Sequence, residues 1–264
     1  MKRTYIERIA RPLPVSIQTF AAGARIFDSS CSPEARVYFL DREDGYYLKT
    51  APNGTLAREA VMTEYFYKKG LGAEVLEYVS EDVDWLLTRR VRGEDCTHSR
   101  YLAEPARLCD LLARSLRALH ELDFCDCPLQ DRMSDYLALA DENFAAGNHD
   151  LSLFEKCASG FSFHSADEAY AVLQEGKGEL KNEVLLHGDY CLPNVMLDDF
   201  RLSGFIDVGN GGVGDRHVDL FWGAWTLAYN LKTDQYRARF FDAYGRDRVD
   251  ESLLRVIAAA EVFG

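Results

Sequence analysis

Short apolar runs bounded by polar turns recur through the first third of the chain. Residues 36–40 and 45–49 are rich in aromatic and branched side chains and flank the polar stretch 41–44, a pattern typical of a β-hairpin. Residues 75–78 and 84–91 have the same character and predict two further strands. This part of the chain therefore predicts a small β-sheet.

Helical periodicity marks longer segments. The first ends at Gly70, and Pro105 suits the first turn of the second, whose leucines recur on one face. The segments expected to be helical are 56–69, 104–120, 131–146, 166–175 and 253–263, with another helix beginning near Asp219. Residues 1–30 carry weak signals, because Pro12 and Pro14 interrupt any helix, and residues 147–165 are typical of a loop.

The stretch 184–208 contains three apolar runs separated by polar residues, and it predicts a hairpin of buried strands. The glycine-rich stretch 209–214 after it is expected to be flexible. Asp189, Asn194 and Asp207 would lie where loops meet these strands, so a packed hairpin would hold their backbones. The stretch is therefore the best candidate for a site.

The three polar residues fit phosphoryl transfer in chain order. That reaction needs one carboxylate to orient a hydroxyl and accept its proton, and an amide with a second carboxylate to hold Mg²⁺ against phosphates. Asp189 fits the first role, and Asn194 and Asp207 fit the second, with spacing that matches the kinase pattern H-R-D-x-x-x-x-N followed by D-F-G. The alternative is that Asp189 and Asn194 form a turn and Asp207 caps a loop, but the ordered set favours a kinase.

Kinases also pair a strand lysine with a helix glutamate to hold the nucleotide phosphates. Lys49 ends its predicted strand, and Glu59 lies on the following predicted helix. Glu64 is the alternative partner on the same helix. A surface lysine and a solvated helix would look similar, but the position of this pair upstream of 184–208 favours Lys49 with Glu59.

The motifs resemble those of the aminoglycoside 3′-phosphotransferase family. They read H-G-D-x-x-x-x-N at 187–194, G-F-I-D-x-G at 204–209 and D-x-x-x-D at 215–219, and L-H-x-x-D-x-x-D-C-P at 119–128 also matches. The resemblance implies a bilobal α+β fold like that of protein kinases. It would have an N-terminal antiparallel sheet lobe with one helix at 1–92, which binds nucleotide, and a larger, mainly helical lobe at 93–264, which carries catalysis and substrate binding.

The resemblance also implies ATP or GTP and Mg²⁺ as cofactors, and nucleotide contacts beyond Lys49 and Glu59. Ser32 falls in the turn that lies over the phosphates in the family. Leu87, Arg89 and Val91 fall in the segment joining the lobes, whose backbone meets the base. No G-x-G-x-x-G is present, and the arginines here are unusual for the family. For Asp215 and Asp219 we expect capping and bracing, and for His120 a structural role.

The acceptor residues depart from the family pattern. Glu155 and Glu261 match its acidic positions, whereas Trp225 and Tyr229 stand where the family carries Arg and Glu. A buried ammonium group needs a carboxylate partner. Because fewer acidic residues match the family here, the identity of the molecule that accepts the phosphate stays undecided. The sequence favours transfer of the γ-phosphate to a hydroxyl of a cationic aminoglycoside. The alternatives are a kinase for another small alcohol and a nucleotide-binding homologue without catalysis.

Composition narrows the class of protein. Of 264 residues 47% are hydrophobic, which is ample for a core, and the net charge of −13 argues against nucleic acid or an anionic membrane as partner. The longest apolar run, 220–229, is too short to span a bilayer, no signal peptide is evident, and seven cysteines fit a reducing compartment. We therefore expect a cytoplasmic enzyme with a small-molecule substrate and no obligate protein partner.

Overall fold

The computed structural model describes residues 3–31, 33, 35–156 and 160–264. The chain forms two compact units. The N-terminal unit contains Met1–Asp95 with two later segments, Met196–Asp198 and Ser203–Asn210, and the C-terminal unit contains the rest. The main division thus falls after Asp95, and the chain enters the N-terminal unit again in the stretch that carries Asp207.

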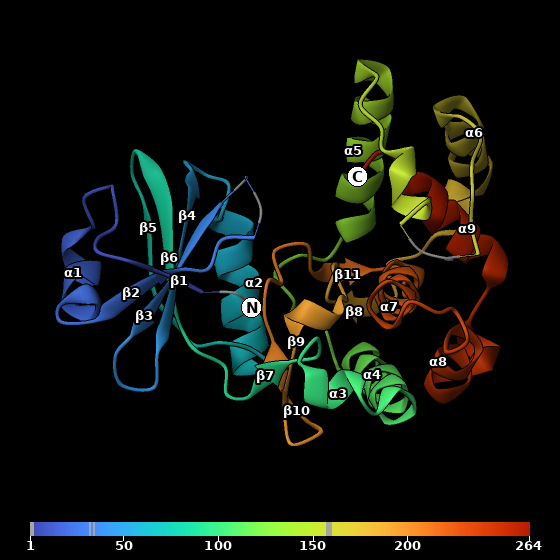
Figure 1. Ribbon diagram of the computed structural model, residues 1–264. Helices are drawn as coiled ribbons and strands as arrows, with labels where there is room; N and C mark the ends of the chain where they lie inside the picture. The colour runs from blue at the N-terminus through green and yellow to red at the C-terminus, as the bar shows by residue number, and fades with distance from the viewer. Residues whose placement is uncertain (1–2, 32, 34, 157–159) are drawn as a thin grey trace. The chain divides into compact units, whose positions relative to one another are not determined.

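The N-terminal unit is built on an antiparallel sheet with strand order β1-β2-β3-β4-β6-β5 (Figure 1). Its strands are β1 (Thr4–Ile6), β2 (Arg25–Asp28), β3 (Arg36–Asp41), β4 (Tyr46–Pro52), β5 (Val75–Ser80) and β6 (Val83–Arg89). Its helices are α1 (Val15–Ala21) and α2 (Ala57–Lys68). The predicted hairpin is confirmed as β3 and β4, the two further strands as β5 and β6, and the predicted helix as α2.

The two faces of this sheet bury different helices, because successive side chains of a strand point to opposite faces. Leu48 and Leu87 pack with Ile17 of α1, whereas Leu86 packs with Ala60 of α2. Lys49 follows Leu48 on β4, so it belongs to the face that α2 covers. The alternation therefore directs the lysine toward the helix that carries Glu59.

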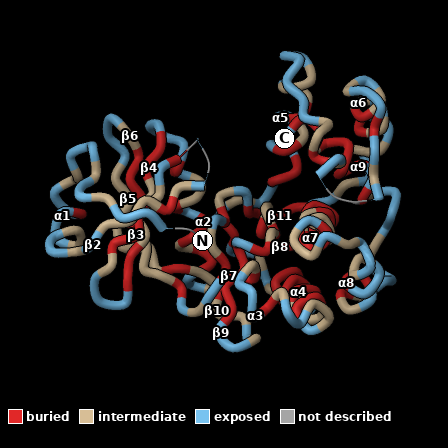
Figure 2. The backbone as a smooth tube through the Cα atoms, viewed as in Figure 1, coloured by how far each residue is buried: buried red, intermediate tan, exposed pale blue. Residues whose placement is uncertain are grey.

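The C-terminal unit is mainly helical. Its helices are α3 (Ser99–Leu102), α4 (Pro105–His120), α5 (Arg132–Ala146), α6 (Ala166–Gly176), α7 (His217–Leu231), α8 (Arg237–Tyr244) and α9 (Glu251–Ala260). Helix α4 packs against α8 and α7, and α9 packs against α6 and α7. Figure 2 shows burial concentrated on α4 and α7, whose leucine and aromatic side chains form much of the core. The predicted helices of this half of the chain are confirmed.

The predicted hairpin is present as β9 (Val195–Asp198) and β10 (Arg201–Phe205), whereas the first apolar run, 184–186, pairs elsewhere. β8 (Val184–Leu186) pairs with β11 (Gly212–Gly214), while β9 lies between β10 and β7 (Glu94–Asp95). The expectation that 209–214 is flexible is wrong for 212–214, which form a buried strand. A β-carbon on Gly214 would lie 2.5 Å from a methyl of Leu186, so glycine serves close packing here.

Several elements were not expected from the sequence. β1, α1 and β2 lie in the stretch judged weak, and α1 begins at Val15, directly after Pro14. Only Ile17 of this helix is buried, so its periodicity is faint. Within the described part of the chain, no helix is long and apolar enough to cross a membrane.

Candidate active site

The loop 187–194 carries two of the predicted residues and brings them together. β8 ends at Leu186, and the 3₁₀ helix η3 (Leu192–Asn194) leads into β9. Nδ2 of Asn194 donates to Oδ2 of Asp189 at 2.8 Å and to the Asp189 carbonyl at 3.1 Å. The Asp189 carboxylate is thereby held in one orientation at the end of a buried strand.

A buried carboxylate on α7 braces this loop. Asp219 is fully buried, and its Oδ2 and Oδ1 accept the backbone N–H groups of His187 and Gly188, each at 2.8 Å. Nε2 of His120 lies 3.1 Å from the same carboxylate, and Nδ1 of His120 lies 2.8 Å from the Tyr244 hydroxyl. The bracing role expected for Asp219 and the structural role expected for His120 are confirmed.

Asp215 stabilises the start of α7. Its Oδ1 accepts the backbone N–H of His217 at 2.9 Å and lies 2.6 Å from Nδ1 of the same ring. Burial alone would raise the pKa of Asp215, but the hydrogen bonds from His217 lower it below its ordinary value. Oδ2 accepts the backbone N–H of Lys181 at 2.9 Å, so both carboxylate oxygens are engaged. Asp215 therefore braces the turn before α7, while the N-cap position itself is Arg216.

In the N-terminal unit, Lys49 joins two carboxylates. Its Nζ lies 2.7 Å from Oε2 of Glu59 and 2.9 Å from Oδ1 of Asp207. Glu64, the alternative partner, instead pairs with Lys68 at 3.1 Å on the surface of α2. The predicted lysine, the predicted glutamate and the predicted metal aspartate therefore form one cluster.

Charge and backbone geometry distinguish this cluster from a surface ion pair. Burial would lower the pKa of Lys49, but the Asp207 and Glu59 carboxylates raise it, so Lys49 remains an ammonium. Burial raises the pKa of Glu59 even though Lys49 opposes the shift. Asp207 has φ of +58°, a left-handed conformation that is uncommon for non-glycine residues, although aspartate adopts it more readily than most.

Sequence reasoning missed Asp84, which positions α2. This fully buried carboxylate accepts the backbone N–H groups of Gly54 at 3.0 Å and Leu56 at 2.8 Å, and the Ser80 hydroxyl at 2.7 Å. Burial would raise the pKa of Asp84, but these hydrogen bonds lower it. The start of α2, and with it Glu59, is thereby tied to β6. An aspartate inside the apolar run 83–87 was the available signal.

The remaining predicted nucleotide contacts have varied surroundings. Leu87 is buried in mid-strand between β4 and β5, and Arg89 pairs with Glu74 at 2.7 Å. Val91 packs in an apolar cluster with Ala73, Met196 and Ile206. Ser32 lies outside the described residues.

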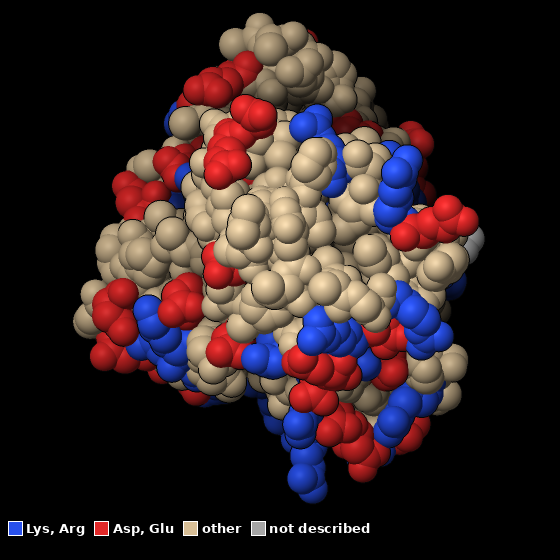
Figure 3. Space-filling view, turned by 90° about the vertical axis from the view of Figure 1, so that its left-hand side faces the viewer, with Lys and Arg blue, Asp and Glu red and all other residues tan. Residues whose placement is uncertain are grey.

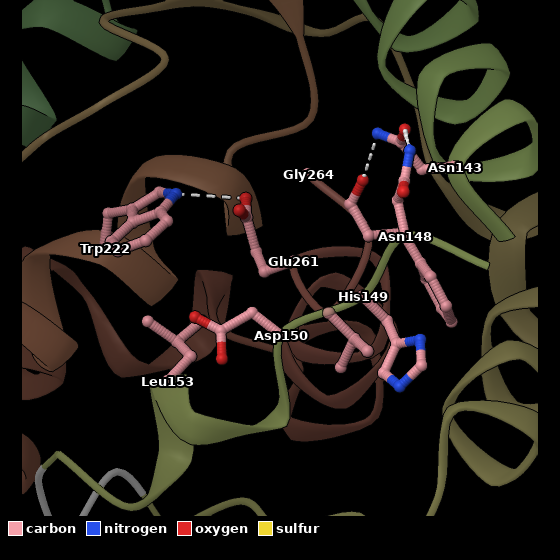
Figure 4. Close-up of a pocket in the computed structure, with 10 residues that line it drawn as sticks. Asn143, Asn148, His149, Asp150, Leu153, Trp222, Glu261 and Gly264 are labelled. Atoms are coloured by element: carbon pink, nitrogen blue, oxygen red, sulfur yellow. Dashed lines mark hydrogen bonds between the residues drawn. The ribbon is translucent and has the colours of Figure 1, made fainter. Parts of the chain in front are cut away.

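A pocket of about 330 Å³ opens within the C-terminal unit (Figure 4). It combines amide, carboxylate and aromatic side chains from α5, η1 (Leu151–Phe154), α7 and the segment after α9. The lining residues are Asn143, Asn148, His149, Asp150, Leu153, Trp222, Glu261, Val262, Phe263 and Gly264. Such a concave mixture of polar and aromatic groups suits a polar small molecule.

Glu261 is the most perturbed acid of the pocket. Its Oε1 accepts the Tyr136 hydroxyl at 2.8 Å and the Trp222 indole N–H at 3.0 Å. Burial raises the pKa of Glu261 to about 7, and the charge of Asp189 adds to the rise. The charge of Asp189, which was predicted separately, therefore opposes the ionisation of Glu261.

The other predicted acceptor residues contact each other or solvent. Trp225 and Tyr229 are stacked with their ring centroids 4.9 Å apart, and Lys232 lies 4.2 Å from the centroid of Tyr229. Nε1 of Trp225 donates to the carbonyl of Leu153 at 3.2 Å. Glu155 is exposed just after η1. Of these side chains, Trp225 affects the pocket, because it holds η1 through the carbonyl of Leu153, and Leu153 lines the pocket.

The side-chain oxygens available for Mg²⁺ suit an ion that arrives already bound to phosphate. Within the described ranges, no group of three or more His, Cys, Asp or Glu side chains could hold a metal ion. Mg²⁺ usually takes one or two protein oxygens and completes its shell with water and phosphate. Asp207 is half-exposed, and the amide nitrogen of Asn194 faces Asp189, which leaves its oxygen as the donor. Each therefore offers one oxygen ligand.

The surface charge is mixed where it is visible. On the face shown in Figure 3, lysine and arginine side chains alternate with aspartate and glutamate around an uncharged centre. A polyanion would need clustered cations, and this face does not provide them.

Residues 32–254 match the family model described as the phosphotransferase enzyme family. The chain is 49% identical over 252 residues to a probable aminoglycoside 3′-phosphotransferase of Lactococcus lactis, with 95% of each chain covered. It is 31% identical over 250 residues to an aminoglycoside 3′-phosphotransferase of Streptomyces fradiae, with 88% of each covered. The sequence resemblance thus extends over nearly the whole chain.

Solved structures share the fold. One is an aminoglycoside 3′-phosphotransferase of type VIII, with a TM-score of 0.76, 24% identity, and 94% of this chain and 98% of that chain covered. Another is an aminoglycoside phosphotransferase from Streptomyces rimosus in complex with ADP and streptomycin, with a TM-score of 0.69, 23% identity, and 94% and 99% covered. The kinase-like α+β fold is confirmed, and the chain belongs to the aminoglycoside 3′-phosphotransferase family of phosphotransferase enzymes.

Proposed function

We propose that this phosphotransferase moves the γ-phosphate of ATP or GTP to a hydroxyl group of an aminoglycoside. The observation that carries the proposal is the Asp189 carboxylate, which Asn194 holds in a loop whose backbone Asp219 fixes. A carboxylate fixed in this way can accept a hydrogen bond from a hydroxyl group. The names of the relatives support the same acceptor class.

The N-terminal unit would bind the nucleotide. Lys49, oriented by Glu59, would contact the phosphates, as a strand lysine does in kinases. Leu87, Arg89 and Val91 would supply backbone and apolar contacts to the base. Val91 lies in an apolar cluster that could face a planar ring. Bound ADP in the Streptomyces rimosus structure supports nucleotide use.

Asp189 would act as the general base. It would accept a hydrogen bond from the acceptor hydroxyl, orient its oxygen toward the γ-phosphorus and take its proton. The new P–O bond would form as the bond from the γ-phosphorus to the β-phosphate oxygen breaks and ADP or GDP leaves. Asn194 and Asp207 would hold Mg²⁺. When bound, this ion would neutralise charge on the phosphate oxygens. Asp219 would keep the loop backbone in place throughout.

A second acceptor class is favoured by one observation. Trp225 and Tyr229 stack on each other where the family carries Arg and Glu, so α7 presents aromatic rings in place of charges. This change favours a less cationic alcohol, and a kinase for another small alcohol is therefore the alternative function. A nucleotide-binding homologue without catalysis is the less favoured one, because the lysine, the base and both metal ligands are present.

A panel assay tests the proposal. Nucleotide consumption is measured with ATP and GTP against aminoglycosides and against small alcohols such as choline and homoserine. We expect aminoglycoside-dependent release of ADP or GDP, and phosphorylated acceptor by mass spectrometry. Turnover confined to other alcohols would support the alternative. Nucleotide binding with no acceptor-dependent turnover would support the non-catalytic homologue.

A further inference from the structure

Two residues with no role in the motifs converge on Glu261. Tyr136 lies on α5 and Trp222 on α7, and both donate to the same carboxylate oxygen, Oε1 (Figure 4 shows the Trp222 bond). A carboxylate accepts hydrogen bonds through two oxygens. With Oε1 occupied twice, Oε2 is the atom that Glu261 can offer to a molecule in the pocket.

The two donors are themselves held rigidly. The Trp222 ring packs edge-to-face with Trp225, their centroids 5.5 Å apart, and Trp225 stacks in turn on Tyr229. The guanidinium carbon of Arg132 lies 5.8 Å from the centroid of the Tyr136 ring, and both residues are buried. Each donor therefore reaches Glu261 from a packed helix, which fixes the carboxylate more firmly than a solvated side chain would.

The electrostatic surroundings oppose ionisation of Glu261. Burial is the largest effect and raises its pKa, while the Tyr136 and Trp222 hydrogen bonds lower it. Asp189 from the loop 187–194 raises it further, and Arg132 of α5 lowers it. The net result is a carboxyl group with a pKa of about 7. Removal of either donor would therefore favour the protonated form, which cannot pair with an ammonium group.

We propose that Tyr136 and Trp222 are positioning residues that hold Glu261 ionised, with Oε2 directed toward a cationic group of the acceptor. This inference rests on the proposed function for the identity of the acceptor. The proposal accounts for the small number of acidic residues that match the family's acceptor positions, because one well-oriented carboxylate would replace several. It also assigns Trp222, rather than Trp225 or Tyr229, as the aromatic residue of α7 that affects acceptor binding, through its hydrogen bond to Glu261.

The first test requires no acceptor. The chain has three tryptophans, so the indole N–H region of an NMR spectrum holds three signals, and Trp222→Phe identifies one of them. In the wild-type protein we expect the Trp222 signal to titrate with a midpoint near pH 7, as Glu261 ionises. Glu261→Gln should abolish this titration, and Tyr136→Phe should move the midpoint to higher pH. A Trp222 signal unaffected by Glu261→Gln would overturn the proposal.

The second test uses kanamycin as acceptor. At pH 7, Tyr136→Phe and Trp222→Phe should each raise the KM for kanamycin about fivefold, since a one-unit rise from a pKa of about 7 lowers the ionised fraction from about one half to about one tenth. The KM should return toward the wild-type value by about pH 8.5, and kcat and the KM for nucleotide should stay near wild type. A merely structural role would raise KM equally at both pH values, and that result would contradict the proposal.

The control variant is Tyr170→Phe on α6. It removes a hydroxyl that donates a hydrogen bond to Asp141 of α5 at 2.9 Å, and it leaves the hydrogen bonds of Glu261 intact. It should change neither the NMR midpoint nor the KM. If the wild-type protein neither binds nor phosphorylates kanamycin, the proposed acceptor is wrong. The NMR titration still decides the roles of Tyr136 and Trp222 in that case.

Discussion

The Lys49 ammonium lies 2.9 Å from the carboxylate of Asp207, which follows it in the chain by 158 residues. Because Glu59 binds the same ammonium, a single cation joins β4, α2 and the segment after β10. A lysine held in this way cannot swing freely into solvent. It is oriented before any nucleotide arrives, which reduces the entropy lost on binding.

Lys49→Met removes this cation and nearly preserves side-chain length. We expect kcat/KM for the nucleotide to fall about 10- to 100-fold, because a hydrogen bond to a charged group contributes about 1.5–3 kcal/mol. Kanamycin binding, measured by calorimetry without nucleotide, should be unchanged. Lys68→Met, which breaks only the surface pair with Glu64, serves as the control and should behave as wild type. Wild-type nucleotide kinetics in Lys49→Met would exclude the assigned role.

Asp219→Asn tests the brace of the loop 187–194. The amide would turn an NH₂ group toward a backbone N–H that now donates to the carboxylate, so a buried donor loses its acceptor. We expect the free energy of unfolding to fall by about 2–4 kcal/mol, measured by urea denaturation. We also expect kcat to fall.

The matched control is Asp242→Asn, whose carboxylate is exposed and pairs with Arg246 one helical turn away. Its effect on the free energy of unfolding should stay within about 0.5 kcal/mol. Equal stability of the Asp219 and Asp242 variants would show that the loop does not depend on Asp219.

Glu261 gives stability a pH dependence of known sign. Its pKa is raised from 4.5 to about 7 in the folded chain, so the folded state binds a proton that the unfolded state has already released. Its contribution is therefore present below pH 4.5 and is lost as pH rises through about 7. Glu261→Gln keeps an oxygen for Tyr136 and Trp222 but removes the charge. Above pH 7 the variant should be roughly 3 kcal/mol more stable than wild type, with no gain near pH 4.

Thermal unfolding of both proteins from pH 4 to pH 9 measures this difference. A stability difference that is constant across the range would mean that Glu261 titrates with an ordinary pKa. In that case burial and the charge of Asp189 do not oppose the ionisation of Glu261 in the folded chain.

The residues that sequence reasoning found share one property. Asp189, Asn194 and Asp207 are polar residues at fixed spacing among apolar runs. Lys49 lies on a strand of alternating pattern, although it falls in the middle of β4 (Tyr46–Pro52) and not at its end as predicted. A polar residue at a fixed place among apolar neighbours can be recognised in the sequence alone. Both the kinase-like fold and the pairing of Lys49 with Glu59 could therefore be predicted.

The residues it missed depend on packing between distant segments. Tyr136 and Trp222 look like ordinary core aromatics, and only the approach of α5 and α7 to the end of α9 turns them into donors to Glu261. The pairing of Val184–Leu186 with Gly212–Gly214 was hidden in the same way. Glycines that indicate flexibility in sequence here permit close contact with Leu186.

Asp189→Asn in an assay that follows both nucleotide binding and acceptor-dependent turnover is the most direct test of the proposed chemistry. The amide keeps the shape of the side chain and an oxygen for Asn194, but it cannot accept the hydroxyl proton. We expect turnover of kanamycin to fall about 10²- to 10⁴-fold, while the Kd for nucleotide and the unfolding temperature remain those of wild type. Turnover near the wild-type rate, or loss of nucleotide binding in a folded variant, would contradict the assignment of Asp189 as the base.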